Sequence, residues 1–159
     1  MISAIVAYSK NNKVIGVNNT IPWHIKEDFL HFKAYTINKT IIMGTNTYYS
    51  IGKPLPQRKT IVASTNKDLV INHPDVIITN DLFETLNKYK NTDEELVVCG
   101  GGKIYELSLP FVDKLVISEV KKQYDGDTYF PSFEREFTLV SEEEKDEFII
   151  KTYIRNKVK

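Results

Sequence analysis

An acidic residue, Asp28, lies on the face of a predicted helix that should pack against the protein core. Residues 21–33 predict a helix that begins near His24 or Ile25, and a turn of about 100° per residue places Asp28 among apolar side chains. The residues on that side are Ile25, Asp28, Phe29, Phe32 and Tyr35. A carboxylate without a partner in apolar surroundings is costly or stays protonated. Either the protein or a ligand must therefore pair with Asp28, unless it caps another element or lies at the edge of the helix.

Three predicted strand ends carry features that suit an anionic ligand. Gly44 comes before residues 45–47 and a short helix, and Gly100, Gly101 and Gly102 come before another helix. Free backbone N–H groups at a helix start bind anions, and glycine lets the backbone approach a phosphate closely. Residues 64–67 add hydroxyls and a lysine after a third strand. Since ligands of open α/β sheets bind beyond the carboxyl ends of strands, the three ends together predict a dinucleotide site. The glycines do not match G-x-G-x-x-G, because position 105 is tyrosine.

Arg58 is a candidate for binding a carboxylate. It is one of three arginines and follows a rigid Pro-x-Pro turn. From such a turn a guanidinium can bind a carboxylate through two parallel hydrogen bonds. A surface ion pair is the plain alternative.

The elements that must position these residues alternate between strand and helix as far as residue 107. Strands are predicted over 2–8, 40–44, 59–63, 75–78, 95–99 and 114–120, and two more near 137–140 and 148–154. The first helix is predicted to begin near His24 or Ile25 and to end between residues 36 and 39. Further helices are predicted over 47–51, around Leu82, Phe83 and Leu86 with Asn80 or Asp81 as cap, and over 103–107. This order predicts an α/β domain with a mainly parallel sheet and an antiparallel C-terminal pair. The loop over residues 9–20 is long enough to suggest a function, and the acidic run 142–147 is predicted to be a solvated hairpin loop.

Composition narrows the class of protein. The chain has 159 residues, of which 42% are hydrophobic and 26% charged, and its formal net charge is zero. These values favour one soluble domain and argue against nucleic acid or an anionic membrane as the main partner. There is no signal-peptide pattern and no apolar run long enough to span a bilayer. The single cysteine, Cys99, excludes an internal disulfide, and the three histidines lack metal-ligand spacing. We therefore expect a cytoplasmic protein without a metal.

The chain resembles bacterial dihydrofolate reductase over almost its whole length. The matching pieces occur in the family's order: Ala7, Ile15-Gly16, Pro22-Trp23, Asp28-Phe29 with Phe32, Met43-Gly44 with Thr47, Ser50-Ile51-Gly52, Pro54-Leu55-Pro56 with Arg58, Gly100-Gly101-Gly102 with Tyr105, and Gly126-Asp127-Thr128 with Phe130-Pro131. The resemblance implies an eight-stranded, mainly parallel sheet with an antiparallel C-terminal strand and about four flanking helices. It also implies a single reductase domain over 1–159, in which 39–90 approximates an adenosine-binding subdomain, and a monomer.

The resemblance further implies reduction of 7,8-dihydrofolate to tetrahydrofolate by NADPH, by hydride transfer to C6 and protonation at N5, in support of one-carbon metabolism. Asp28 would bind the pterin, Ser118 would hydrogen-bond Asp28, and Trp23 would hold a water near it. Arg58 would take the glutamate α-carboxylate. Antifolates such as trimethoprim or methotrexate would be inhibitors. The implied catalytic residues are Asp28, Trp23, Ser118 and Ile21. The implied substrate contacts are Ile5, Val6, Ala7, Asp28, Phe29, Phe32, Ser50, Ile51, Leu55, Arg58, Cys99, Tyr105 and Ser118.

The resemblance also implies a set of cofactor contacts and a lid. The cofactor contacts are Ala7, Ile15, Gly16, Asn19, Thr20, Ile21, Gly44, Thr45, Asn46, Thr47, Ser64, Thr65, Lys67, Cys99, Gly100, Gly101, Gly102, Lys103, Ile104 and Tyr105. The loop over residues 9–23 would close over nicotinamide and hydrogen-bond Asp127, and the Gly100–Gly101 peptide bond would be cis. Thr45 and Lys103 depart from the family, where basic residues and arginine are frequent, which weakens the expectation of a strict NADPH preference, although Lys67 could bind the 2′-phosphate.

Two other functions remain open from the sequence. One is a different reductase on the same fold, such as a pyrimidine reductase of riboflavin synthesis. Asp28, Phe32 and Arg58 argue against it, because a ribosylated pyrimidine has no p-aminobenzoyl-glutamate tail. The other is a nucleotide-binding module without catalysis, which the intact Asp28 does not suggest.

Overall fold

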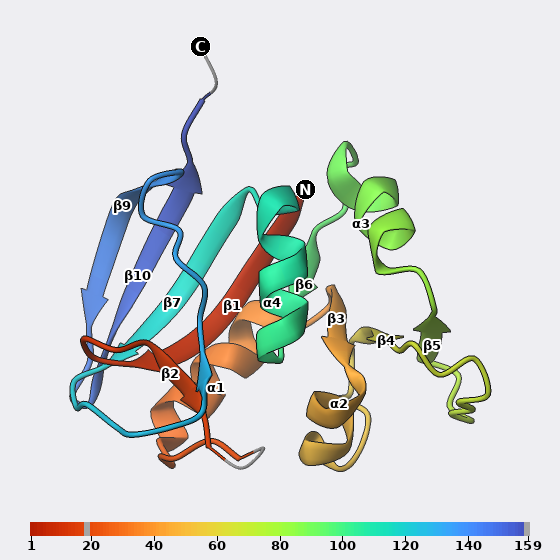
Figure 1. Cartoon of the computed structure of the whole chain (residues 1–159), viewed down its shortest axis with the longest axis horizontal. Helices are drawn as coiled ribbons and strands as arrows, with labels where there is room; N and C mark the ends of the chain where they lie inside the picture. The colour runs from red at the N-terminus through yellow and green to blue at the C-terminus, as the bar shows by residue number, and fades with distance from the viewer. Residues whose placement is uncertain (18–19, 158–159) are drawn as a thin grey trace.

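A central eight-stranded sheet organises the protein (Figure 1). The computed structural model describes residues 1–17 and 20–157. The strands of this sheet are β1 (Ile2–Ser9), β3 (Thr40–Gly44), β4 (Lys59–Ala63), β5 (Val76–Thr79), β6 (Leu96–Val98), β7 (Lys114–Val120), β9 (Phe137–Glu144) and β10 (Phe148–Arg155). The spatial order is β5-β4-β3-β6-β1-β7-β10-β9, and β10 runs antiparallel to the other seven strands. The predicted α/β fold is therefore confirmed.

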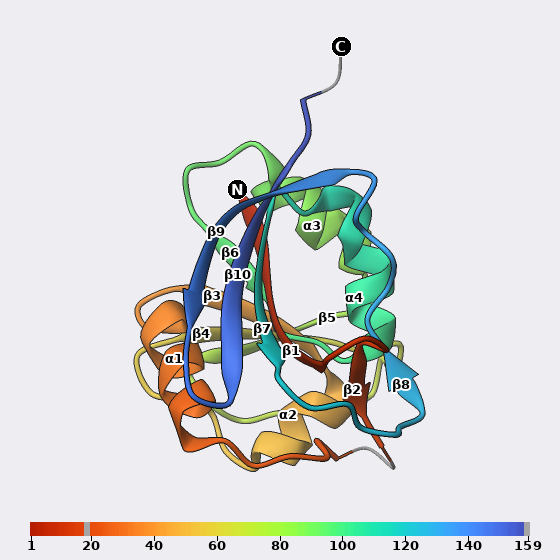
Figure 2. The same cartoon turned by 90° about the vertical axis from the view of Figure 1, so that its left-hand side faces the viewer.

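Helices cover both faces of the sheet (Figure 2). They are α1 (Lys26–Thr36), α2 (Thr45–Ile51), α3 (Leu82–Lys90) and α4 (Gly102–Ser108), with a 3₁₀ turn over Leu109–Phe111. Alternate residues of β1 separate the two cores. Ile2, Ala4, Val6 and Tyr8 pack with side chains of α3 and α4, whereas Ile5 packs on the other face with side chains of α1 and α2. A strand that is buried on both faces explains the continuous apolar run at the start of the chain.

The predicted helix starts agree with the structure to within one or two residues. The first helix begins at Lys26 with Ile25 as N-cap, and Asp81 caps α3 by accepting a hydrogen bond of 3.0 Å from the Glu84 N–H. The second helix begins at Thr45 rather than Thr47, because Gly44 is its N-cap. Helix starts are the least certain part of a prediction from sequence, since several neighbouring residues can serve as the cap.

The acidic run 142–147 is a hairpin loop only over residues 145–147, and the prediction is wrong for its first three residues. The β9 strand continues to Glu144, and Glu142, Glu143 and Glu144 pair with β10. The strand β9 is the edge of the sheet, and its glutamates are exposed. Charged side chains suit an edge strand because they oppose pairing with another chain, so an acidic sequence does not exclude a strand there.

A second, two-stranded sheet is the element that the sequence did not reveal. It pairs β2 (Val14–Gly16) with β8 (Thr128–Tyr129), and both strands are too short to show a periodicity. In Figures 1 and 2 this small sheet lies beside the carboxyl end of β1. It ties the long loop after β1 to the segment after β7.

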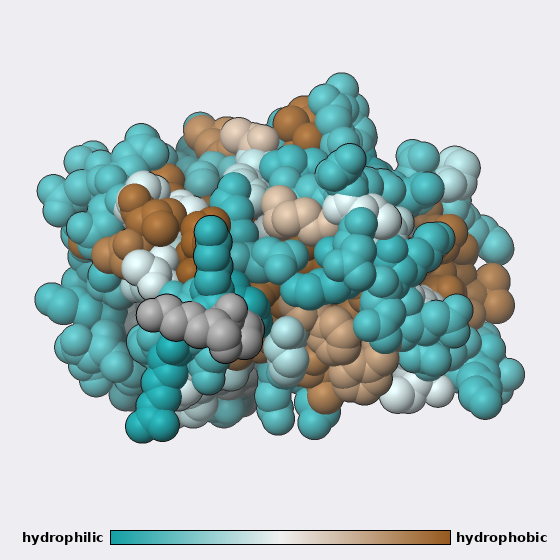
Figure 3. Space-filling view, turned by 90° about the horizontal axis from the view of Figure 1, so that it is seen from above, coloured by the Kyte–Doolittle hydropathy of each residue, from teal (hydrophilic) through white to brown (hydrophobic). Residues whose placement is uncertain are grey.

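The face that carries the C-terminus is mostly hydrophilic, and its apolar side chains form separate groups (Figure 3). None of the helices in residues 1–17 and 20–157 is both long enough and apolar enough to cross a lipid bilayer.

Candidate active site

Asp28 lies in the first turn of α1 and is partly buried. Burial raises the pKa of the Asp28 carboxyl, and the Ser118 hydroxyl and His31 oppose that shift without cancelling it. Ser118 comes from β7, where it pairs in register with Ala7 of β1. No lysine or arginine forms an ion pair with Asp28 within the part of the chain that the structure describes. The carboxylate therefore faces the interior with hydroxyl and imidazole neighbours but no cation to balance its charge.

A buried tyrosine and a partly buried cysteine from distant parts of the chain share the surroundings of Asp28. Tyr105 of α4 donates a hydrogen bond of 2.6 Å to the carbonyl of Ile5. Burial raises the pKa of Tyr105, and Cys99 and Asp28 raise it further, so the three groups lie within electrostatic reach of one another. Burial also raises the pKa of the Cys99 thiol. A thiol that stays protonated at neutral pH is a poor nucleophile, so Cys99 contributes surface to the site rather than covalent chemistry.

The apolar residues that the sequence assigns to the substrate fall into two groups. Ile5 and Val6 are buried in the sheet, and Ala7, Phe32 and Leu55 are partly buried. By contrast Phe29 and Ile51 are 52% and 37% exposed, and the polar substrate residue Ser50 is also exposed. Ile21, which is predicted to act in catalysis and to contact the cofactor, is 55% exposed. The Phe29 ring packs against His24 at 5.4 Å between ring centres. Exposed apolar side chains on α1, α2 and the 9–23 loop lose water favourably when a ligand covers them.

Arg58 is not a surface residue, and the surface ion pair that the sequence left open is absent from the described part of the chain. It is 4% exposed. Its Nε donates to Thr36 Oγ1 at 2.8 Å, its Nη2 donates to the Lys33 carbonyl at 2.8 Å, and its Nη1 donates to the Pro56 carbonyl. A guanidinium has five N–H groups, two on each terminal nitrogen. One N–H on Nη1 and one on Nη2 thus remain, and two N–H groups of this kind can bind a carboxylate in bidentate fashion.

The carboxyl ends of β3 and β6 meet as predicted. Gly44 N–H donates to the Gly100 carbonyl at 2.8 Å, and the Cys99 N–H donates to the Ile42 carbonyl at 2.9 Å. The Gly100–Gly101 peptide bond is cis, in agreement with the expectation. Gly100 has φ of 104°, and a side chain there would come within 2.9 Å of the Tyr105 ring, so glycine is required. The N-caps of α2 and α4 are Gly44 and Gly101, and neither position provides a side-chain hydrogen bond to the first N–H groups of its helix. These backbone N–H groups are therefore available to a ligand.

The remaining predicted cofactor residues around these two helix starts are Thr45, Asn46 and Thr47 in α2, and Gly102, Lys103 and Ile104 in α4. Lys103 is exposed, and with Gly102 it lines a surface groove of about 490 Å³ that continues to β8.

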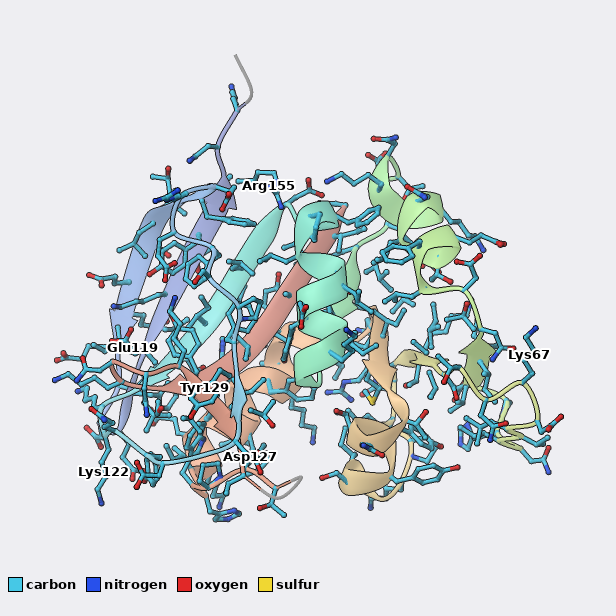
Figure 4. The ribbon with its side chains drawn as sticks, in the orientation of Figure 1. Lys67, Glu119, Lys122, Asp127, Tyr129 and Arg155 are labelled. Carbon is cyan, nitrogen blue, oxygen red and sulfur yellow. The ribbon has the colours of Figure 1, made fainter. Side chains whose placement is uncertain are left out.

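The loop over residues 64–68 lies at the end of β4, next to Gly44. Ala63 pairs with Gly44, and Ser64 follows directly. The side chain of Asn80 donates to the Ser64 carbonyl at 2.8 Å, which holds the loop against the end of β5. Thr65 and Lys67 are exposed. Figure 4 shows Lys67 near β5, well separated from Asp127 and Tyr129. The predicted cofactor residues therefore extend from the 9–23 loop to the edge of the sheet formed by β4 and β5.

The 9–23 loop is fixed along the 121–130 segment. Asp127 N–H donates to the Gly16 carbonyl at 3.1 Å, which agrees with the expected contact between Asp127 and the loop. Ile15 and Gly16 lie in β2, and Thr20 forms an isolated bridge with Val17. Asn19, which the sequence assigns to the cofactor, lies outside the described residues.

Comparison with known proteins identifies the family. A sequence model of dihydrofolate reductase matches residues 1–155. This chain belongs to the dihydrofolate reductase family. It is 47% identical over 133 residues to dihydrofolate reductase of Buchnera aphidicola subsp. Schizaphis graminum, with 83% of this chain and 80% of that one covered. It is 38% identical over 150 residues to dihydrofolate reductase of Bacillus subtilis, with 92% and 87% covered. The structure resembles that of dihydrofolate reductase from Enterococcus faecalis complexed with NADP(H) and RAB-propyl, with a TM-score of 0.87, 29% identity and 99% and 97% of the two chains covered.

The structure of this dihydrofolate reductase family member also reveals residues that the sequence did not single out. Thr36 is fully buried, and it orients Arg58 while its own hydroxyl donates to the Phe32 carbonyl at 2.8 Å. A polar residue eight positions after Asp28, on the same helix face, is the signal that could have revealed it. Tyr124 packs against Trp23 with 5.2 Å between ring centres, and no local sequence pattern predicts this contact.

Proposed function

We propose that this chain reduces 7,8-dihydrofolate to 5,6,7,8-tetrahydrofolate with NADPH. The observation that carries this proposal is the partly buried Asp28 carboxylate, whose charge no lysine or arginine of the described residues balances. A pterin ring supplies the missing donors, because its 2-amino group and ring N3 can donate together to one carboxylate. Charge-assisted hydrogen bonds of this kind contribute roughly 1.5–3 kcal/mol each.

Arg58 fits the other end of the substrate. Its guanidinium is buried and held through three nitrogens, so little side-chain entropy is lost when it binds. The free pair of N–H groups matches the α-carboxylate of the glutamate tail in bidentate fashion. Between Asp28 and Arg58, the side chains of Phe32, Ile51 and Leu55 offer an apolar surface for the aminobenzoyl ring. The substrate is then held at both ends, and its pterin has one orientation.

The strand ends fit the cofactor. Two helix starts without side-chain caps, at Gly44 and Gly101, suit the pyrophosphate, and Ser64, Thr65 and Lys67 suit the 2′-phosphate. We assign residues 39–90 to the subdomain that binds the adenosine half. Bound NADPH supplies the hydride that reaches C6 of the pterin.

Protonation at N5 needs a route from solvent. Asp28 pairs with the far side of the pterin, so it favours N5 protonation through its charge and does not hand over the proton itself. A water held by Trp23 delivers the proton. Closure of the 9–23 loop, with Ile21 near the nicotinamide, excludes other water from the reacting atoms. The product supports one-carbon metabolism.

The test is the decrease of absorbance at the nicotinamide band when the protein, NADPH and dihydrofolate are mixed. Steady turnover is expected, and no turnover with a ribosylated aminopyrimidine. Turnover of the pyrimidine alone would favour the other reductase, and cofactor binding without any turnover would favour a nucleotide-binding module. Either result would contradict the proposal.

A further inference from the structure

Tyr124 contacts both ends of the 9–23 loop. At the start of the loop, Asn12 Nδ2 donates to the Tyr124 carbonyl at 2.7 Å. At the end of the loop, the Trp23 ring lies 5.2 Å from the Tyr124 ring, with 51° between the planes. Aromatic pairs in this distance range attract each other beyond the effect of the area they bury. The two ends of one loop are therefore fixed at a single residue of the 121–130 segment.

The orientation of the Asn12 amide is determined by a chain of hydrogen bonds. The Val14 N–H donates to Ser9 Oγ at 2.9 Å, and Ser9 Oγ donates to Asn12 Oδ1. The Asn12 amide oxygen is thus occupied, and its nitrogen must point at the Tyr124 carbonyl. Pairing of β2 with β8 fixes Val14 opposite Tyr129 in the same part of the molecule. When β2 docks on β8, the Tyr124 backbone is held in place.

The packing of Trp23 against Tyr124 connects the position of Tyr124 to the start of α1. Both rings are partly buried and pack against the apolar cluster that includes Ile25, the N-cap of α1. Asp28 lies three residues after Ile25, in the first turn of that helix. A shift of the Trp23 ring therefore occurs next to the start of α1, the helix that carries Asp28.

We propose that Tyr124 is a positioning residue for Trp23, and that Asn12 links its position to the docking of the 9–23 loop. This inference rests on the proposed function, in which Trp23 holds the water that protonates N5. The ring of Tyr124 supports one face of the indole, so that the water site forms only when both ends of the loop are fixed. In this proposal Tyr124 acts through Trp23 and not by contact with the pterin.

Fluorescence tests the contact without any catalysis. Trp23 is the single tryptophan of the chain, so its emission reports on this ring alone. Tyr124→Leu should move the emission to longer wavelength and make it more sensitive to acrylamide, because the indole gains water. Tyr124→Phe keeps the ring and should match the parent. Asn12→Asp keeps the acceptor for Ser9 but loses the donor to the Tyr124 carbonyl, and it should shift the emission in the same direction as Tyr124→Leu.

Kinetics tests the consequence. A displacement of about 1 Å at a reacting group can cost up to roughly 10²-fold in rate. Tyr124→Leu should lower kcat by about tenfold at mildly alkaline pH, where protonation depends on the positioned water. At mildly acidic pH, where solution supplies protons readily, the loss should be small. KM for dihydrofolate should stay unchanged, since the groups that bind the pterin and the glutamate are intact.

Asn11→Asp is the matched control for Asn12→Asp. It makes the same charge change on the neighbouring residue, whose amide donates to the exposed Gln123 side chain. It should leave emission and the pH profile at parental values. Equal effects of the two variants, parental emission in Tyr124→Leu, or an equal kcat loss at both pH values would each overturn the proposal. If Tyr124→Leu fails to fold, the Asn12 and Asn11 pair decides the question. If the parent does not reduce dihydrofolate, the proposed function fails, while the fluorescence series still decides whether Tyr124 positions Trp23.

Discussion

Replacement of Asp28 by asparagine tests the central charge of the site. The side chains have nearly the same shape, so the change removes a charge and leaves the packing of α1 intact. Asp28 is partly buried and its pKa is raised, which means that the protein maintains this carboxylate at a cost. We expect Asp28→Asn to lose most of its turnover and to become more stable at neutral pH.

The loss of turnover follows from two hydrogen bonds to the pterin. Each charge-assisted bond contributes roughly 1.5–3 kcal/mol, and about 1.4 kcal/mol corresponds to a factor of ten in rate. Loss of the charge at both bonds predicts a decrease of about 10²- to 10⁴-fold at neutral pH. Partial recovery is expected at acidic pH, where solution protonates N5 without help from Asp28. Cofactor binding should not change.

The gain in stability has a defined pH range. Because the native pKa of Asp28 lies above its unfolded value, the native state binds more protons between the two values. The free energy of unfolding therefore falls as the pH rises through that range, and the full cost of the charge applies above the native pKa. Asp28→Asn avoids this cost, so its Tm should exceed the parental Tm at neutral pH and match it at a pH below the ordinary carboxyl pKa.

Stopped-flow and steady-state turnover, together with thermal unfolding at several pH values, check both expectations. Asp146→Asn makes the same charge change on an exposed residue of the β9–β10 turn and should alter neither turnover nor Tm. Parental turnover of Asp28→Asn at neutral pH would refute the role of Asp28 in the reaction. A lower Tm at neutral pH would refute the inference that its charge destabilises the fold.

Three further changes test other parts of the site. Arg58→Leu should weaken dihydrofolate binding by more than about tenfold and trimethoprim binding much less, because the inhibitor lacks the glutamate tail, and equal losses of affinity would contradict the assigned role. Ser118→Ala removes a hydroxyl that lowers the pKa of Asp28, so the pKa of Asp28 should rise. The acidic limb of the pH profile of kcat/KM should then move to higher pH. An unchanged acidic limb would show that Ser118 does not act on Asp28. Gly126→Ala places a methyl group 2.4 Å from Val14 Cγ1, which should destabilise the pairing of β2 with β8 by about 1–3 kcal/mol and slow turnover, whereas a parental Tm and kcat would show that this contact is easily relaxed.

Local patterns were sufficient for most of the fold. The apolar run of β1, the alternation of strands and helices, and the cap at Asp81 each depend on a few neighbouring residues. The predictions for Gly44 and for the triple glycine succeeded for the same reason, since a strand followed by glycine and a helix start is a local signal. The strand β9 was predicted only as far as residue 140, because the acidic composition of its last residues suggested a loop, and only their pairing with β10 makes them part of the strand.

The sequence by itself determined that Asp28 faces inward, that Arg58 follows a rigid turn, and that glycines end two strands. Tertiary structure decided what surrounds them. The hydroxyl beside Asp28 comes from β7, ninety positions later in the chain, and the three acceptors around Arg58 come from α1 and from the preceding turn. Likewise, Tyr124 reaches Trp23 only because the 9–23 loop docks on the 121–130 segment. Periodicity and capping act over a few residues, whereas strand register and ring packing depend on segments that the folded chain alone brings into contact.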